Sequence, residues 1–174
     1  MYASVNTFKT MFQCFGSSLE YTDCAKYLGC FISSDFSDDS DIRRLVRSTY
    51  ARGNTLISKF RHCSTDVKSK LFKSYCSSFY GSNIWCSFNV SSRKKLTVAY
   101  KQVFRSFFSC KREATTFQML CHDIQPYDVL ERKYLNGFLD RIFNCDNIIV
   151  KAIVNAMFFT STQFYKRCDK ILYT

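Results

Sequence analysis

The sequence predicts an α+β fold that is mostly α, with a short N-terminal β-hairpin or small sheet followed by a helical bundle. Residues 1–36 are rich in β-branched and aromatic side chains, which favour strands. From Ser37 onward, apolar residues recur at spacings of three and four, the pattern of amphipathic helices. Strands that precede a run of helices indicate segregated α+β layers rather than alternating βαβ units.

The first strands are expected over Tyr2–Phe15 and Tyr27–Ile32. Gly16, Ser17 and Ser18 are turn-forming residues and predict a turn after the first strand. The second run is apolar with Gly29 in its middle, and the polar residues that follow Ile32 predict its end.

The first long helix is expected to begin near the acidic residues at 38–41, since carboxylates favour helix N-termini. Its apolar stripe comprises Ile42, Leu45, Val46, Thr49, Gly53, Leu56, Ile57 and Phe60. Gly53 lies on this stripe, where it either permits close approach of another helix or breaks the helix in two.

Further helices follow the same pattern along the chain. A second is expected from Ser64 with Val67, Leu71, Tyr75 and Phe79 on one face, and Gly81–Asn83 would end or kink it before Trp85. A third follows Ser91–Ser92 and turns Leu96, Ala99, Tyr100, Val103, Phe104, Phe107 and Phe108 inward. A short helix is predicted over 115–122, one from Pro126 to Phe143, and a last apolar core helix from Asp146–Asn147 to Phe159.

The positive charge is concentrated in one block. Between Arg43 and Arg112 the chain has 16 Lys or Arg and one acidic residue, Asp66, so this segment has a net charge of +15. The net charge of the whole chain is +11. The remaining residues, nine basic and 13 acidic, are therefore net negative at −4. Such segregation is typical of a surface that binds a polyanion, although a basic face without any partner is the simpler alternative.

Composition argues against several classes of protein. The ten Cys are irregularly spaced, and no signal peptide is visible at the N-terminus, so reduced and mostly buried thiols are expected rather than a secreted disulfide scaffold. No apolar run reaches the roughly 18 residues of a membrane span. We therefore expect no membrane partner and an intracellular protein, nuclear or cytoplasmic.

Two motifs and their order resemble a known family. Val5–Met11 with Cys14–Phe15 resembles the Asn-x-x-Lys-Ser/Thr segment of non-long-terminal-repeat (LINE-type) retrotransposon reverse transcriptases, and Lys26–Gly29 resembles the Lys-Tyr-Leu-Gly that follows it. The similarity continues to about residue 145, through segments 37–42, 50–54, 71–76 and 96–105. Each motif alone is weak, whereas their shared order is specific.

The resemblance implies the C-terminal part of an RNA-directed DNA polymerase encoded by a transposable element. Residues 1–36 would be the palm edge and primer grip, 37–112 the basic thumb-like region, and 113–174 the connection region. Lys9 matches the palm lysine near the incoming nucleotide, and Tyr27, Leu28 and Gly29 match the hairpin that grips the primer. The thumb lies along the template–primer duplex of RNA or DNA, so its basic residues are candidate phosphate contacts, with about half expected to matter: Arg43, Arg44, Arg47, Arg52, Lys68, Lys73, Arg93, Lys94, Lys95, Lys101 and Arg105.

Catalysis is not expected from this chain alone. The family holds Mg²⁺ on aspartates upstream of the Asn-x-x-Lys segment, and only five residues precede Asn6. Asp38–Asp39 resembles the catalytic aspartate pair of the family. However, it lies after Lys26–Gly29 rather than before it, and its flanking residues are polar, so a helix N-cap is favoured. No zinc motif or phosphate-binding glycine loop is present, and no cofactor is expected. A Cys–His pair remains open, with no spacing that singles one out.

Three functions fit these patterns. The first is a remnant polymerase that binds nucleic acid without catalysis. The second is part of an active reverse transcriptase whose catalytic half is encoded upstream or on another chain. The third is a domesticated interaction module whose apolar helices bind a partner protein or a second copy. The aromatic residues among the basic ones are expected to be core rather than stacking platforms.

Overall fold

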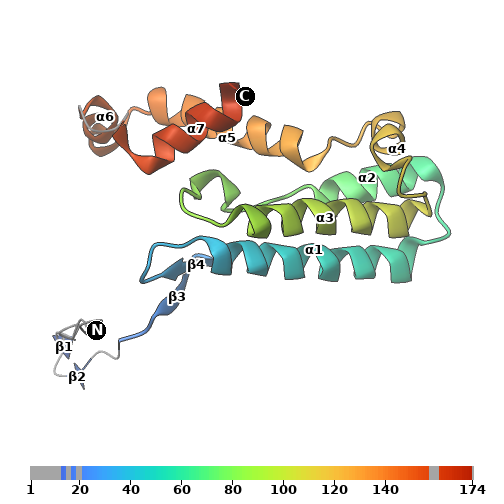
Figure 1. Ribbon diagram of the computed structural model, residues 1–174, viewed down its shortest axis with the longest axis horizontal. Coiled ribbons are helices and arrows are strands. Elements are labelled where there is room, and N and C mark those ends of the chain that lie inside the picture. The colour runs from blue at the N-terminus through green and yellow to red at the C-terminus, as the bar shows by residue number, and fades with distance from the viewer. Residues whose placement is uncertain (1–12, 15–16, 19–20, 157–160, 174) are drawn as a thin grey trace, which may run out of the picture.

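The computed structural model describes residues 13–14, 17–18, 21–156 and 161–173, and it confirms the mostly helical α+β fold (Figure 1). Strands β1 (Gln13–Cys14) and β2 (Ser17–Ser18) form one antiparallel pair. Strands β3 (Cys24–Tyr27) and β4 (Cys30–Ser33) form a second. Ser17 and Ser18 were predicted as turn residues, and they instead pair as strand. The remainder of the first predicted strand lies outside the described residues.

The second predicted strand is wrong, because its middle is a turn. Leu28 and Gly29 both have positive φ, at 46° and 84°, and together connect β3 to β4. Two left-handed central residues are the requirement of the tight hairpin turn that matches strand twist. Gly29 adopts this conformation freely, whereas Leu28 does so against the preference of a residue with a side chain. The apolar run therefore contributes to two strands.

The helices follow the expected order. They are α1 (Asp39–Phe60), α2 (Thr65–Cys76), the 3-10 turn η1 (Ser82–Ile84), α3 (Val90–Phe108), α4 (Thr115–Cys121), α5 (Tyr127–Phe143), α6 (Ile148–Asn155) and α7 (Gln163–Tyr173). Asp38 is the N-cap residue of α1, as the acidic cluster predicted, and Pro126 is that of α5. No helix was predicted at α7, although Phe164, Cys168, Ile171 and Leu172 recur at helical spacing.

Helices α1 and α3 lie side by side and run in the same direction (Figure 1). The Asn89 backbone N–H at the start of α3 donates to Asp39 Oδ1 at the start of α1, at 2.9 Å. Farther along, a Cβ placed on Gly53 would lie 2.7 Å from Val103 Cγ2 and closer still to Cγ1. Gly53 therefore permits the close approach of two helices, and α1 continues through it without a break.

Replacing Gly53 with Ala is expected to lower the free energy of unfolding by about 1–2 kcal/mol. The added methyl group overlaps the side chain of Val103, whose χ1 angle is restricted because it is β-branched and helical, while better helix propensity offsets part of the loss. Urea denaturation would measure the change. Gly137→Ala in α5 is the matched control, since its Cβ meets nothing within 4 Å, and it should stabilise slightly. The double variant Gly53→Ala with Val103→Ala should lose less stability than the sum of the losses in the two single variants. Strictly additive losses would contradict the close packing of the two residues.

The main core spans α1, α2, α3 and the start of α5. The buried residues predicted for α3 are confirmed, except that Phe108 is only partly buried. For α2 the predicted face is partly confirmed: Phe79, beyond the end of the helix, is buried, and Leu71 is partly buried against the core. Val67 and Tyr75 are exposed instead, while Phe72 and Cys76 are buried. The side of α2 that packs on α3 is shifted by one residue from the predicted one. The ring of Phe72 lies on that side, with centroid distances of 5.3 Å to Tyr100 and 5.6 Å to Phe104.

A smaller core joins the C-terminal helices. Leu135 and Leu139 of α5 pack on Cys168 of α7. The main core extends from Ile42 to Leu130, so it crosses position 112, while the proposed division of the chain into three regions stays a prediction. No helix in the described part of the chain is long and apolar enough to cross a membrane.

Two expectations about burial are corrected. Helix α6 was predicted to be a core helix, but Ile148 and Ile149 are exposed and none of its residues is buried. Its cap is confirmed, because Asn147 Oδ1 accepts from Ile149 N at 2.9 Å. The nine described Cys are free thiols, yet only Cys76 and Cys168 are buried, so the thiols are mostly not core. Burial raises the pKa of Cys76 to about 11, which keeps that thiol protonated and unreactive.

Candidate nucleic-acid interface

The outer sides of α1 and α3 form a basic face. Arg43, Arg47 and Arg61 recur along α1 and its C-cap at helical spacing, and Lys94, Lys101 and Arg105 do so along α3. Tyr50 of α1 donates its hydroxyl to Gln102 Oε1 of α3 at 3.0 Å, which joins the outer edges of the two helices. We call this surface the α1/α3 face. It is defined by seven basic residues: Arg43, Arg47, Arg61, Lys94, Lys95, Lys101 and Arg105.

Most charges on the α1/α3 face are not neutralised within the fold. In the described ranges, Arg47, Lys94, Lys95, Lys101 and Arg105 form no ion pair. Arg43 donates its Nε to the carbonyl oxygen of Asp39, at 3.4 Å, and its side chain remains exposed. These cations are therefore available to an anionic partner.

Four of the predicted contact residues, namely Arg44, Arg52, Lys73 and Arg93, have partners within the fold. Arg44 binds the carboxylate of Asp41 through Nε at 2.6 Å and Nη2 at 3.1 Å. Arg52 donates to the carbonyl oxygens of Tyr75 and Ser78, at 3.3 and 2.9 Å. The Arg52 contacts fix the chain that leaves α2. Both guanidinium groups therefore have internal partners.

Lys73 and Arg93 also have internal partners. Lys73 Nζ lies 2.6 Å from Asp123 Oδ2, in a pair exposed enough to contribute little to stability. Arg93 bonds Glu131 and Asp128 of α5. Lys68 lies over the ring of Phe107, with Nζ 5.6 Å from the centroid. Whether any of these residues also contacts nucleic acid stays a prediction.

The residues matched to the primer grip lie at the β3–β4 turn. Tyr27 and Leu28 are 64% and 72% exposed, and Gly29 is exposed beside them. Tyr27 and Leu28 line a groove of about 320 Å³, and Trp85 is among its other lining residues. Lys9 lies outside the described residues.

The acidic residues at the start of α1 accept hydrogen bonds from backbone and side-chain donors of other segments. Asp38 Oδ2 accepts from the backbone N–H groups of Cys86 and Ser87, at 2.7 and 2.8 Å, and makes no cap bond to its own helix. Burial raises the pKa of Asp38 despite these bonds. Among the residues that the structure describes, no group of three His, Cys, Asp or Glu side chains is placed to hold a metal ion.

Asp41 is the most heavily bonded of these carboxylates and is buried. Besides Arg44, it accepts from the backbone N–H of Phe31 at 3.0 Å and from the indole Nε1 of Trp85 at 3.0 Å. Burial by itself would raise the pKa of Asp41, but the bonds from Arg44, Phe31 and Trp85 lower it below its ordinary value. Asp41 thereby ties the β3–β4 hairpin, α1 and the segment after η1 together.

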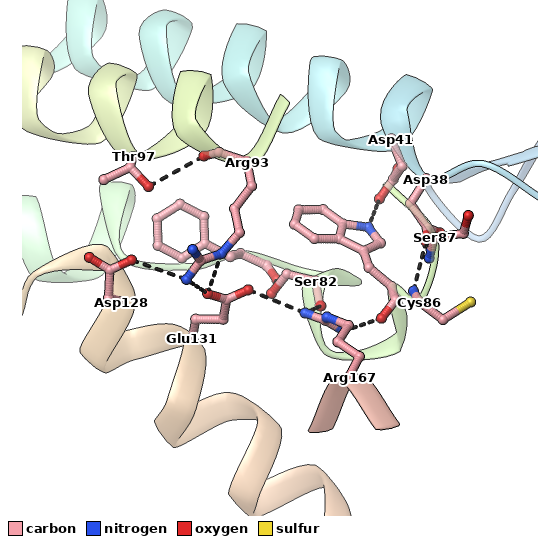
Figure 2. A network of polar contacts seen from close by, with 12 residues as sticks. Asp38, Asp41, Ser82, Cys86, Ser87, Arg93, Thr97, Asp128, Glu131 and Arg167 are labelled. Carbon is pink, nitrogen blue, oxygen red and sulfur yellow. Dashed lines mark hydrogen bonds and ion pairs between the residues drawn. The ribbon is translucent and has the colours of Figure 1, made fainter. Parts of the chain in front are cut away.

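A second polar network joins α3, α5 and α7 (Figure 2). Glu131 accepts from Arg93 Nε at 2.9 Å and from Arg167 Nη2 at 3.2 Å, and it is 3% exposed. Arg167 also donates to the carbonyl oxygens of Trp85 and Ser82. One buried carboxylate thus bonds two guanidinium groups from different helices.

Sequence reasoning missed most of these residues. Glu131 and Arg167 are 36 positions apart on separate helices, and no periodicity relates them. Arg61 was also missed, but it lies 14 residues, or about four turns, after Arg47 on the same stripe, so helical spacing could have identified it.

Comparison of the chain with protein families, with curated proteins and with solved structures found no match.

Proposed function

We propose that the protein binds the phosphate backbone of a nucleic-acid duplex through the α1/α3 face, as the thumb-like part of a reverse transcriptase does. The observation that carries the proposal is a row of cations on two parallel helices, in a block that holds one acidic residue. They form no ion pair within the described part of the chain, and all are exposed except Lys101 and Arg105, which are half-buried. The resemblance to the LINE-type family, made from sequence alone, names the same region.

The dimensions of the face suit a duplex. Helix α1 has 22 residues and is therefore about 33 Å long, close to one turn of a double helix. Cations spaced at one or two helical turns along it can reach successive phosphates. Contacts of this kind carry no sequence information, which is what a protein that moves along a template–primer duplex requires.

The proposal assigns no catalytic step to this chain. In a reverse transcriptase the Mg²⁺-binding aspartates would act on the nucleotide, and the chain would position the duplex beside them. A protein-interaction module is the second candidate, and the exposed isoleucines of α6 favour it. Such a module has no need of duplex binding, so the following titration separates the two.

Binding to a labelled RNA–DNA or DNA duplex should weaken steeply as salt rises, because phosphate contacts release counterions. Fluorescence anisotropy at several salt concentrations gives the slope of log K against log salt. Changing Arg47, Lys95 and Lys101 to Gln should reduce the slope by about 0.9 for each contact removed. The RNA–DNA hybrid and the DNA duplex also measure the preference between the two.

The matched control changes Lys70, Lys133 and Arg141 to Gln, since these exposed cations lie on α2 and α5, away from the α1/α3 face. It removes the same charge and should leave the slope nearly unchanged. Equal losses in both triple variants would reduce the effect to net charge and contradict the interface. Absence of binding at low salt would overturn the proposed function altogether.

A further inference from the structure

A pocket of about 260 Å³ lies where the β3–β4 hairpin meets the first turns of α1 (Figure 1). Two residues of the hairpin and four of α1 line it: Cys24, Phe31, Ser40, Arg43, Arg44 and Arg47. Half of these residues are arginines, and none of the described residues that line the pocket is acidic. Arg43 and Arg47 belong to the α1/α3 face, so the pocket lies at the end of this face where α1 begins.

The hairpin wall of the pocket is fixed on α1. The backbone N–H of Phe31 donates to Asp41 Oδ1 at 3.0 Å, and the hydroxyl oxygens of Ser33 and Ser40 lie 3.2 Å apart. Phe31 and Ser33 are two positions apart on β4 and so share one side of the hairpin, where Cys24 lies directly opposite Ser33. The row of cations on α1 therefore ends beside a wall that is held in place by two contacts.

Arg44 is oriented before any ligand arrives. Its Nε and Nη2 bond the carboxylate of Asp41 at 2.6 and 3.1 Å, and Nη2 also donates to the carbonyl oxygen of Tyr80 at 3.1 Å. Asp41 is buried, and its charge is balanced by that of Arg44. The third nitrogen of this guanidinium, Nη1, bonds no acceptor in the described part of the chain. Arg44 therefore offers the pocket a donor whose position is already fixed.

Arg43 and Arg47 supply the excess positive charge of the pocket. Both side chains are exposed, and neither forms an ion pair within the described ranges. Arg43 donates its Nε to the carbonyl oxygen of Asp39, which leaves both terminal nitrogens for a ligand. The carboxylate of Asp39 accepts from the backbone and the side chain of Asn89 instead. Two guanidinium groups without a bonded carboxylate thus border one space.

We propose that this pocket binds the terminal phosphate of a nucleic-acid strand. The inference rests on the proposed function, because a strand that follows the α1/α3 face brings its end to the hairpin wall. A terminal phosphate monoester bears about two negative charges at neutral pH and an internal phosphodiester about one, so the excess charge favours the terminus. Planar guanidinium groups bind phosphate oxygens with paired hydrogen bonds. A phosphate at the 5′ end and one at the 3′ end share this chemistry.

A thymidine trinucleotide tests the pocket separately from the duplex. It spans about 10 Å at the rise of a duplex strand, whereas α1 is about 33 Å long, so it cannot occupy the whole α1/α3 face. Titration calorimetry compares three forms, with a 5′ phosphate, with a 3′ phosphate and with hydroxyl groups at both ends. At least one phosphorylated form should bind about tenfold more tightly than the hydroxyl form.

The trinucleotide distinguishes failure of the pocket from failure of the proposed function. Equal affinity of the three forms, or no binding of any, would overturn the pocket even where a duplex binds. Preference for a phosphorylated form together with absence of duplex binding would retain the pocket and remove the duplex. Lys70→Gln in α2 is the charge control, since Lys70 is exposed and does not line the pocket, and it should leave trinucleotide binding unchanged.

Arg43→Gln and Arg61→Gln are a matched pair at the two ends of α1. Each removes one exposed cation from the α1/α3 face, but only Arg43 lines the pocket. Fluorescence anisotropy compares duplexes that have or lack a terminal phosphate. Arg43→Gln should abolish the preference for the phosphorylated duplex, whereas Arg61→Gln should weaken the binding of both duplexes by the same factor and keep the preference. Loss of the preference in both variants, or in neither, would contradict the pocket.

Discussion

Glu131→Ala is expected to lower the free energy of unfolding by about 3–5 kcal/mol, the usual cost of removing one partner from a buried ionic network. The change leaves Arg167, which is 9% exposed, without a counter-charge and deprives Arg93 of its buried partner. Arg93 retains Asp128, at 3.1 Å, so Arg167 suffers the larger loss. Urea denaturation followed by circular dichroism measures the effect.

Two further variants make the Glu131 result interpretable. Glu113→Ala removes a glutamate that is exposed and should change stability by less than about 0.5 kcal/mol. Glu131→Gln combined with Arg167→Met removes both charges and should be more stable than Glu131→Ala, since no buried charge is then left unpaired. A loss below about 1 kcal/mol in Glu131→Ala would show that α7 does not depend on the network.

Asp41→Asn is expected to lower the free energy of unfolding by about 3 kcal/mol at neutral pH. Both oxygens of Asp41 accept hydrogen bonds, from Phe31, Arg44 and Trp85. An amide keeps one acceptor but turns an NH₂ group toward a donor, so at least one buried group loses its partner. Asp66→Asn is the matched control, because Asp66 is exposed in the first turn of α2.

The difference between wild type and Asp41→Asn should depend on pH. The folded-state pKa of Asp41 lies below the ordinary value of 3.8, so its ionised form stabilises the fold above that value. The difference should be full at neutral pH and should shrink as the pH falls through the folded-state pKa. Asp38 acts in the opposite direction, since burial raises its pKa and its contribution is lost as pH rises. Comparison of the two proteins at each pH largely removes the Asp38 contribution, and a difference independent of pH would contradict the role of the Asp41 charge.

Long helices with one apolar stripe were predictable because burial on one side is periodic along the chain. Helices α1 and α3 match their stripes almost residue for residue. Gly53 was ambiguous, because its meaning depends on Val103, 50 positions later. Helix α6 shows the opposite failure: its apolar residues predicted burial, yet no other element covers Ile148 or Ile149 in the described part of the chain.

The candidate interface was predictable as a region but not as a set of residues. Charge counting identified the basic block, and helical spacing identified its outer positions. Neither pattern could separate Arg47, which is exposed and forms no ion pair with the described residues, from Arg44, whose guanidinium is bonded to Asp41. The two residues lie one turn apart at most, and only their neighbours in space distinguish them.

The sequence by itself determined the helices from α1 to α6, the segregation of charge and the approximate position of the hairpin, although α7 was missed. These properties depend on residues close together along the chain. The tertiary structure decided that Leu28–Gly29 is a turn, which cations are neutralised, and that Arg167 reaches Trp85 across 82 positions. Such contacts depend on how distant elements pack, and a local pattern of hydrophobic and charged residues does not encode the partner of a buried charge.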